Sequence, residues 1–291
     1  MVPAQLRDIY LGGLVAPPPP SRFVAIAGQP GSGKRRLAID AQTQMTLCGA
    51  YAVHLDSDAL RDHVPGYAVL ARSDPDAAFR LSQPYVSAWA DEIRDAAIRC
   101  NYNLVLEGLF KTPSTREALW GVLQAQNYHR ALQMRLVPRF LSLIQIEYRY
   151  EKQLAAQLRS ASEDQPSGRR EIKSVGEASP RRVPASNHND AVKGLPALLA
   201  SAVAAPFDEI LIVDSQGHRA IEARGSAVNG ALVDRFQMLL EAPVSTSVVD
   251  AATGRYVETL RMRMARGAPI DPDPGSALEF AAQALAELDA I

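Results

Sequence analysis

The segment "FVAIAGQPGSGKRRLAID" (residues 23–40) constrains the fold more strongly than any other part of the chain. A short apolar run leads directly into the pattern G-x-x-x-x-G-K, which Gly28, Gly33 and Lys34 satisfy, and a helix-forming segment follows. Glycines let such a turn point its backbone N–H groups inward, where they form an anion cradle at a helix N-terminus. The segment therefore predicts a strand, a phosphate-binding loop and a helix in succession.

The loop predicts an ATP site with one unusual position. The residues that we expect to contact ATP are Gly28, Gln29, Pro30, Gly31, Ser32, Gly33, Lys34 and Arg35. Lys34 places a point charge on the β- and γ-phosphates. Arg35 stands where the pattern has a serine or threonine that holds Mg²⁺, and a guanidinium has donors only. Three interpretations stay open: a carboxylate such as Asp56 or Asp58 ligates Mg²⁺ instead, directly or through water, Arg35 itself neutralises phosphate charge, or the site has decayed and binds nucleotide but turns over slowly.

Other short apolar runs alternate with segments of helical period, which predicts an α/β fold. The apolar runs are 23–28, 51–56, 103–108, 132–137 and 209–215, and the helical segments include 34–47, 79–100, 114–126, 139–160 and 187–203. Nearly uniform apolar strands indicate parallel strands buried on both faces. Right-handed crossovers then place helices on both sides of one sheet. We expect a five-stranded parallel sheet of the P-loop NTPase type, flanked by helices.

Composition shifts divide the chain into three predicted parts. Residues 1–20 form a short helix and a proline-rich linker, 21–228 a P-loop kinase domain, and 229–291 an added helical layer. Within the domain, 160–190 is polar and rich in Ser, Pro and Gly, which predicts a long lid loop. The 31 basic and 32 acidic side chains give a net charge of -1, so no global field favours nucleic acid or a membrane. Without a signal peptide or an apolar run long enough to span a bilayer, we expect a cytoplasmic protein.

The cysteine and histidine residues do not predict a further functional site. Cys48 and Cys100 have no metal-type spacing and are expected as buried, reduced thiols. No two histidines stand four apart on one helix, so a histidine metal site is not predicted, and His188 is expected to be solvated. Trp89 and Trp120 lie on expected helices and are predicted to anchor the core.

A pair of carboxylates follows the second predicted strand, in "HLDSDALRDHVPGY" (54–67). Asp56 and Asp58 stand at the carboxyl end of a parallel strand, which in such sheets faces the ligand crevice. One carboxylate can contact metal-bound water while the other takes a proton from a substrate hydroxyl. Alternatively, Asp58 only caps the helix that starts at Ala59. Spacing alone does not decide between these roles.

Several motifs together resemble one family. "GQPGSGK", "LDSDALR", "NYNLVLEG", "YRYE", and "RRVP" followed by His188 and "AVKGLPALL", occur in the order and approximate spacing of zeta toxins, over roughly residues 20–218. The resemblance implies a P-loop kinase that uses ATP and Mg²⁺ to phosphorylate a sugar hydroxyl of UDP-N-acetylglucosamine. It also implies a small helical antitoxin as partner.

The resemblance assigns roles to individual residues. The implied catalytic residues are the loop lysine Lys34, the base Asp58, and the two lid arginines Arg149 and Arg181. The implied substrate-binding residues are Asp91, Glu107 and Lys111. Arg35 departs from the family pattern, as does the 32-residue separation of Arg149 from Arg181, which indicates an insertion in the lid. The alternatives are a kinase of another small metabolite or dinucleotide, and a nucleotide-binding pseudokinase.

Overall fold

The computed structural model describes residues 2–108, 110, 112–163, 182–269 and 276–289. In chain order its main elements are α1 (Ala4–Leu11), β1 (Arg22–Ala27), α2 (Arg35–Leu47), β2 (Ala52–Asp56), α3 (Ser57–Leu60), α4 (Tyr67–Ser73), α5 (Pro75–Arg99), β3 (Asn103–Glu107), α6 (Pro113–Ala125), β4 (His129–Arg135), α7 (Arg139–Glu163), α8 (Ala185–Ala204), β5 (Glu209–Val213), β6 (Arg219–Arg224), α9 (Ala231–Glu241), α10 (Thr246–Ala265) and α11 (Ala277–Asp289). Each strand expected from the sequence is present, with bounds shifted by at most a few residues.

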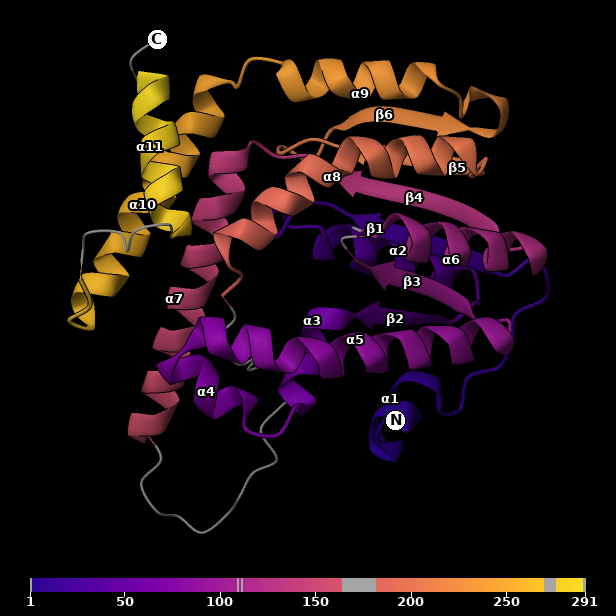
Figure 1. Cartoon of the computed structure of the whole chain (residues 1–291), viewed down its shortest axis with the longest axis horizontal. Coiled ribbons are helices and arrows are strands. Elements are labelled where there is room, and N and C mark those ends of the chain that lie inside the picture. Colours follow the sequence, from indigo (N-terminus) through magenta and orange to yellow (C-terminus); the bar gives the residue numbers. More distant parts are fainter. Residues whose placement is uncertain (1, 109, 111, 164–181, 270–275, 290–291) are drawn as a thin grey trace. The chain divides into compact units, whose positions relative to one another are not determined.

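The strands form one sheet in the order β2-β3-β1-β4-β5-β6 (Figure 1). The first five are parallel, as expected, and the α/β fold class is confirmed. The sixth strand, β6, pairs antiparallel with β5 and was not predicted. It follows β5 after a tight turn that contains Gly217 at φ +94°, and its residues alternate between exposed and buried positions. A half-buried edge strand of this kind lacks the uniform apolar run that marks the central strands.

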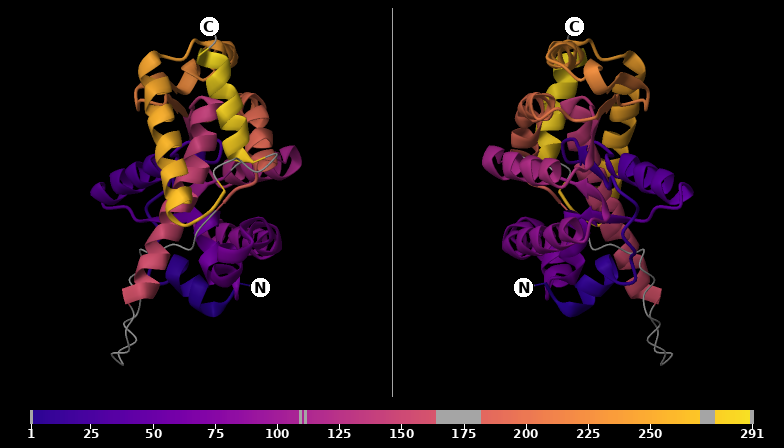
Figure 2. Two further views of the ribbon diagram at one scale, coloured as in Figure 1. Left: turned by 90° about the vertical axis from the view of Figure 1, so that its left-hand side faces the viewer. Right: turned by 90° about the vertical axis from the view of Figure 1, so that its right-hand side faces the viewer.

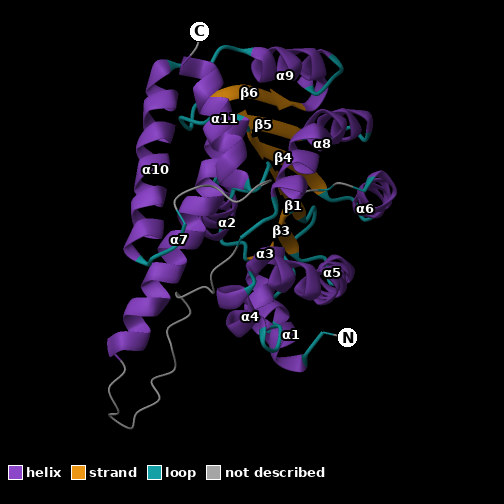
Figure 3. Cartoon of the chain, turned by 60° about the vertical axis from the view of Figure 1, so that its left-hand side comes forward, coloured by secondary structure: helices purple, strands orange, loops and turns teal. Residues whose placement is uncertain are grey.

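Helices cover both faces of the sheet because successive strand residues point to opposite sides. Val24 and Ile26 of β1 pack in one apolar cluster with Leu37 and Ala41 of α2. Phe23, which directly precedes Val24, packs on the opposite face, where its ring centroid lies 5.9 Å from that of Trp120 in α6. The Trp120 indole also donates to the Ser201 hydroxyl of α8 at 3.1 Å. Figure 3 shows α2 on one side of the sheet and α6 and α8 on the other.

The chain divides into two compact units. The sheet unit comprises Met1–Ser57, Ser87–Val137 and Asn189–Pro243, and the helical unit comprises Asp58–Val86, Pro138–His188 and Val244–Ile291. These units interleave along the chain, whereas the domains expected from the sequence are consecutive, so the boundary at 228 stays a prediction. In the helical unit, α10 and α11 both pack along α7 (Figure 2).

Three side chains lie in surroundings other than those expected. Cys48 and Cys100 are free but exposed, because they follow the last residues of α2 and α5, where these helices end. His188 is fully buried, and its Nε2 lies 2.7 Å from the Ser142 hydroxyl of α7. Trp89 and Trp120 are buried, as predicted. Within the described residues, no helix combines the length and apolarity needed to cross a bilayer.

Candidate active site

The loop after β1 has the conformation that its glycines predict. Gly28, Gly31 and Gly33 have φ of +148°, +78° and +80°, values that other residues rarely adopt. A Cβ on Gly28 would lie 2.8 Å from the backbone carbonyl oxygen of Arg135 and 2.8 Å from the Ser32 hydroxyl. Only glycine therefore fits this first position of the loop, where the chain passes closely beside the end of β4.

The loop ends at a helix N-terminus that suits an anion. Lys34 is the N-cap of α2, and no side chain caps the helix there. A helix start of this kind leaves N–H donors and a partial positive charge facing outward. The loop is held in place by Gln29, whose side-chain amide donates to the Val137 carbonyl at 2.7 Å. The Ser32 hydroxyl is buried and has no hydrogen-bond partner, which fits a donor that awaits a phosphate oxygen.

Arg35 begins α2 and points to the acid that ends β2. Its Nη1 lies 3.9 Å from Oδ2 of Asp56, and the two side chains are 64% and 16% exposed. Position 35 offers no oxygen ligand for magnesium, because a guanidinium has donors only, and its charge faces the nearest carboxylate, that of Asp56. Across the described part of the chain, no three His, Cys, Asp or Glu side chains gather as metal ligands. The role of Asp56 as a ligand stays a prediction.

A histidine and a glutamate pair at the carboxyl ends of β2 and β3. His54 Nε2 lies 2.7 Å from Glu107 Oε1, and both side chains are largely buried. Glu107 is in register with Asp56 on the neighbouring strand. The sheet thus brings two of the predicted acids, Asp56 and Glu107, to one edge. Sequence analysis did not single out His54, although its spacing of two from Asp56 places both on one face of β2.

The two other predicted substrate residues give less information. Asp91 lies in α5 with its carboxylate about half exposed, and it forms an ion pair with Arg94 one turn later. Its role in substrate binding stays a prediction. Lys111 lies outside the described residues.

Arg135, at the end of β4, lies against the phosphate loop and was also missed. A Cβ on Gly33 would lie 3.7 Å from its Nε, and this buried Nε has no hydrogen-bond partner. Its Nη2 donates to the Ser215 carbonyl at 3.2 Å. Arg135 also lines a cavity of about 420 Å³ beside α2, over β4, β5 and β6. The rule that ligands meet the carboxyl ends of parallel strands could have pointed to it.

Asp58, the predicted base, begins the helical unit in α3. Its Oδ1 lies 3.4 Å from Nε of Arg61, one turn later. Arg61 is itself buried and donates to the Ser82 hydroxyl and to Gln83 Oε1, each at 2.6 Å. Its guanidinium also lies 4.2 Å from the centroid of the Phe79 ring. Arg61 therefore links Asp58 to α5, a contact that the sequence did not predict, although Arg61 closes the motif "LDSDALR".

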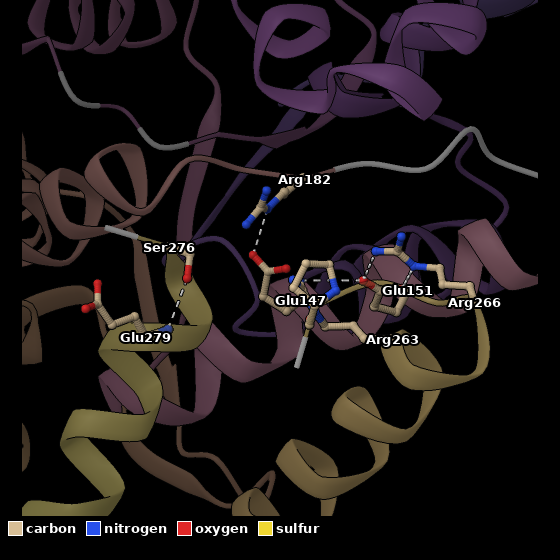
Figure 4. A network of polar contacts seen from close by, with 8 residues as sticks. Glu147, Glu151, Arg182, Arg263, Arg266, Ser276 and Glu279 are labelled. Atoms are coloured by element: carbon tan, nitrogen blue, oxygen red, sulfur yellow. Dashed lines mark hydrogen bonds and ion pairs between the residues drawn. The ribbon is translucent and has the colours of Figure 1, made fainter. Parts of the chain in front are cut away.

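A buried charge network lies on α7, the helix that also carries the predicted lid arginine Arg149 (Figure 4). Glu147 and Glu151, one turn apart, are each 1% exposed. Arg182 donates to Glu147 at 2.8 Å, and Arg266 of the loop after α10 donates to both oxygens of Glu151 at 2.7 Å. Burial raises the pKa of Glu147, an effect that the Arg182 charge opposes. Arg182 is thus engaged on α7.

Arg149 lies on the same helix and is half-buried. Its Nε is buried without a hydrogen-bond partner, as expected of a guanidinium that binds an external anion. Arg181, the second predicted clamp, lies outside the described residues, and so does most of the predicted lid loop.

The parallel sheet, the strand-loop-helix unit and the lysine at its end define an α/β protein of the P-loop type. The zeta toxin family model matches residues 17–225, well over half of the chain. The chain therefore belongs to the zeta toxin family, as the sequence motifs indicated.

Individual relatives are more distant. The chain is 27% identical over 179 residues to a protein named Toxin zeta from Enterococcus hirae, and 29% identical over 138 residues to one from Streptococcus agalactiae. These alignments cover 61% and 47% of the chain, and 54% and 46% of the relatives. The chain thus spans about half the length of the curated relatives it matches.

Two solved structures share the fold. One comes from the PezAT chromosomal toxin-antitoxin system of Streptococcus pneumoniae, with a TM-score of 0.64 and 18% identity, over 88% of this chain and 94% of that one. The other is the complex of AvrRxo1-ORF1 with AvrRxo1-ORF2, with a TM-score of 0.50 and 13% identity, over 92% of this chain and 80% of that one. At these identities the likeness shows the fold alone.

Proposed function

We propose that the protein is an ATP-dependent kinase that transfers the γ-phosphoryl group to a hydroxyl of a nucleotide sugar, with UDP-N-acetylglucosamine as the first acceptor to test. The observation that carries the proposal is the phosphate loop, which leads from a buried parallel strand to an uncapped helix N-terminus at Lys34. Membership of the zeta toxin family supports the reaction class. The acceptor rests on the family resemblance.

Nucleotide binding in this proposal uses the sheet unit. The loop N–H groups, the Ser32 hydroxyl and the Lys34 ammonium bind the phosphates, since each is a donor at the start of α2. We assign the buried Nε of Arg135 to the same ligand, because it lies against the loop at Gly33. This arrangement fixes the polyphosphate before chemistry, which is the main requirement of phosphoryl transfer.

Acceptor binding uses the acids of the proposed site. Glu107, held by His54, would accept hydrogen bonds from the sugar hydroxyls. Asp58 would take the proton of the attacking hydroxyl, which then attacks the γ-phosphorus as the bond to the β-phosphate oxygen breaks and ADP leaves. The contact with Arg61 supports this role, because a base must be held in one orientation. Arg149 would balance the charge of the transferring group, since its forked donors match phosphate oxygens.

A protein partner can be proposed from the family resemblance as well. One structure that shares the fold belongs to a toxin-antitoxin system. We extend the proposal to a small helical antitoxin that binds this chain and blocks its activity. Co-expression with a neighbouring open reading frame, followed by size-exclusion chromatography, tests this part on its own.

The kinase proposal is tested by ADP release from ATP, measured with and without UDP-N-acetylglucosamine. We expect release that depends on the sugar nucleotide and that falls by at least about a hundredfold in Asp58→Asn, in line with the loss of a general base. Arg61→Lys should retain part of the activity, since it keeps a cation beside Asp58. A rate of ADP release that changes neither with the acceptor nor with the Asp58→Asn substitution would refute the proposal.

A further inference from the structure

The start of α2 carries two cations in succession. Lys34 is the N-cap and Arg35 the first residue of the helix, so both charges stand where the helix dipole is already positive. The usual hydroxyl at position 35 would add an oxygen ligand for a metal ion. Here the side chain adds a fixed positive charge, which no chelator removes.

Arg35 is placed to reach an anion in front of the loop. Its side chain is 64% exposed, and its contact with Asp56, at 3.9 Å, is longer than a hydrogen bond. Exposed ion pairs of this kind contribute little to stability. The guanidinium can therefore turn from Asp56 to a phosphate oxygen at small cost, and its fork suits such oxygens.

The neighbouring arginine differs in its surroundings. Arg36 also lies in the first turn of α2, but it pairs with Asp40 on its own helix at 3.0 Å. It lines the cavity beside α2 rather than facing the end of β2. Arg35 and Arg36 carry the same charge but contact different parts of the protein, so Arg36 supplies a matched control for Arg35.

We propose that Arg35 supplies the counter-charge that a divalent cation gives to the nucleotide in other P-loop sites, so that ATP binding to this protein is independent of Mg²⁺. The inference rests on the proposed nucleotide site and adds a property to it. Two features of Arg35 support this: its guanidinium offers only hydrogen-bond donors and so cannot ligate a metal ion, and it lies in front of Asp56.

The test measures the affinity of the full chain for mant-ATP by fluorescence anisotropy, with magnesium chloride or with EDTA, and with unlabelled ATP as competitor. We expect the wild-type Kd to differ by less than about threefold between the two buffers. Arg35→Ser should bind about tenfold more weakly in EDTA, the loss typical of one charged hydrogen bond, and should recover with magnesium. Arg36→Ser should match the wild type in both buffers.

Two further variants separate the outcomes. Asp56→Asn should bind at least as tightly as the wild type in both buffers, because it removes the competing partner of Arg35. A loss confined to the magnesium buffer would show that Asp56 holds a metal, and would overturn the inference. The inference would also be overturned if EDTA weakened ATP binding by the wild type as much as it weakens binding by Arg35→Ser. If the wild type is folded by circular dichroism but binds mant-ATP in neither buffer, the nucleotide site itself is refuted, and the inference with it.

Discussion

The buried pair between Glu151 and Arg266 allows a quantitative prediction about the helical unit. Both carboxylate oxygens of Glu151 accept from Arg266 at 2.7 Å, and Nη1 of Arg263 lies 3.9 Å away. Glu151→Gln keeps the side-chain volume but removes the charge that these two guanidinium groups face. Because Arg263 is only 6% exposed, its charge is left buried beside a neutral amide.

Removal of one partner from a buried ion pair destabilises a protein by about 3–5 kcal/mol. Arg266 is 32% exposed, so solvent relieves part of the penalty and the lower end of that range, about 3 kcal/mol, is expected. Urea unfolding followed by circular dichroism at 222 nm measures the change in the free energy of unfolding. Tryptophan fluorescence, which reports the sheet unit through Trp89 and Trp120, shows whether the two units unfold together.

The control for this prediction is Asp40→Asn, which breaks the exposed pair with Arg36. The side chains of Asp40 and Arg36 are 46% and 75% exposed, and the expected loss in the free energy of unfolding is below about 1 kcal/mol. If Glu151→Gln costs no more than Asp40→Asn, then the charge network does not hold α7 against the C-terminal helices, and the reasoning is wrong.

Three other predictions concern single residues. Burial raises the pKa of Glu147 above its ordinary value of 4.5, so the native state keeps a proton that the unfolded chain has lost, and this group favours folding less as pH rises through that window. Wild-type stability relative to Glu147→Gln, measured by urea midpoints, should therefore increase as the pH is lowered toward the ordinary pKa of 4.5, and a constant difference would contradict this. Gly28→Ala should weaken mant-ATP binding at least about tenfold, since its Cβ would meet a backbone carbonyl at 2.8 Å, whereas Gly49→Ala, with φ +73° and open space, should bind normally. His54→Ala should raise the KM for the acceptor about fivefold and leave that for ATP unchanged, because it releases Glu107; equal changes in both would argue for a merely structural role.

The fold was predictable where the sequence carries a strong local signal. Buried parallel strands such as 23–28 are continuous apolar runs, and the G-x-x-x-x-G-K pattern fixes the strand, loop and helix around them. The edge strand β6 was missed, because a half-exposed strand alternates between polar and apolar residues and lacks a continuous apolar run. The exposure of Cys48 and the burial of His188 depend on where helices end and pack, which neighbouring residues in the sequence do not specify.

The candidate site was predictable only in part, for a physical reason. Lys34 could be placed at a helix start, and Asp56 and Glu107 at strand ends, because their motifs are local. The partners of such groups come from distant segments: at the site, Glu107 is held by His54 from 53 positions earlier, and in the helical unit, Glu151 is held by Arg266 from 115 positions later. Such pairs follow from tertiary packing, so no motif in one stretch of sequence shows them.

The most direct test of the kinase proposal is transfer of label from [γ-³²P]ATP to UDP-N-acetylglucosamine, separated by thin-layer chromatography. We predict a labelled sugar nucleotide with the wild type and almost none with Asp58→Asn, while Asp62→Asn, an exposed neighbouring acid, behaves like the wild type. A wild-type protein that binds ATP but labels neither this acceptor nor any metabolite of a cell extract would contradict the central claim. Equal labelling by Asp58→Asn would contradict the role given to the base.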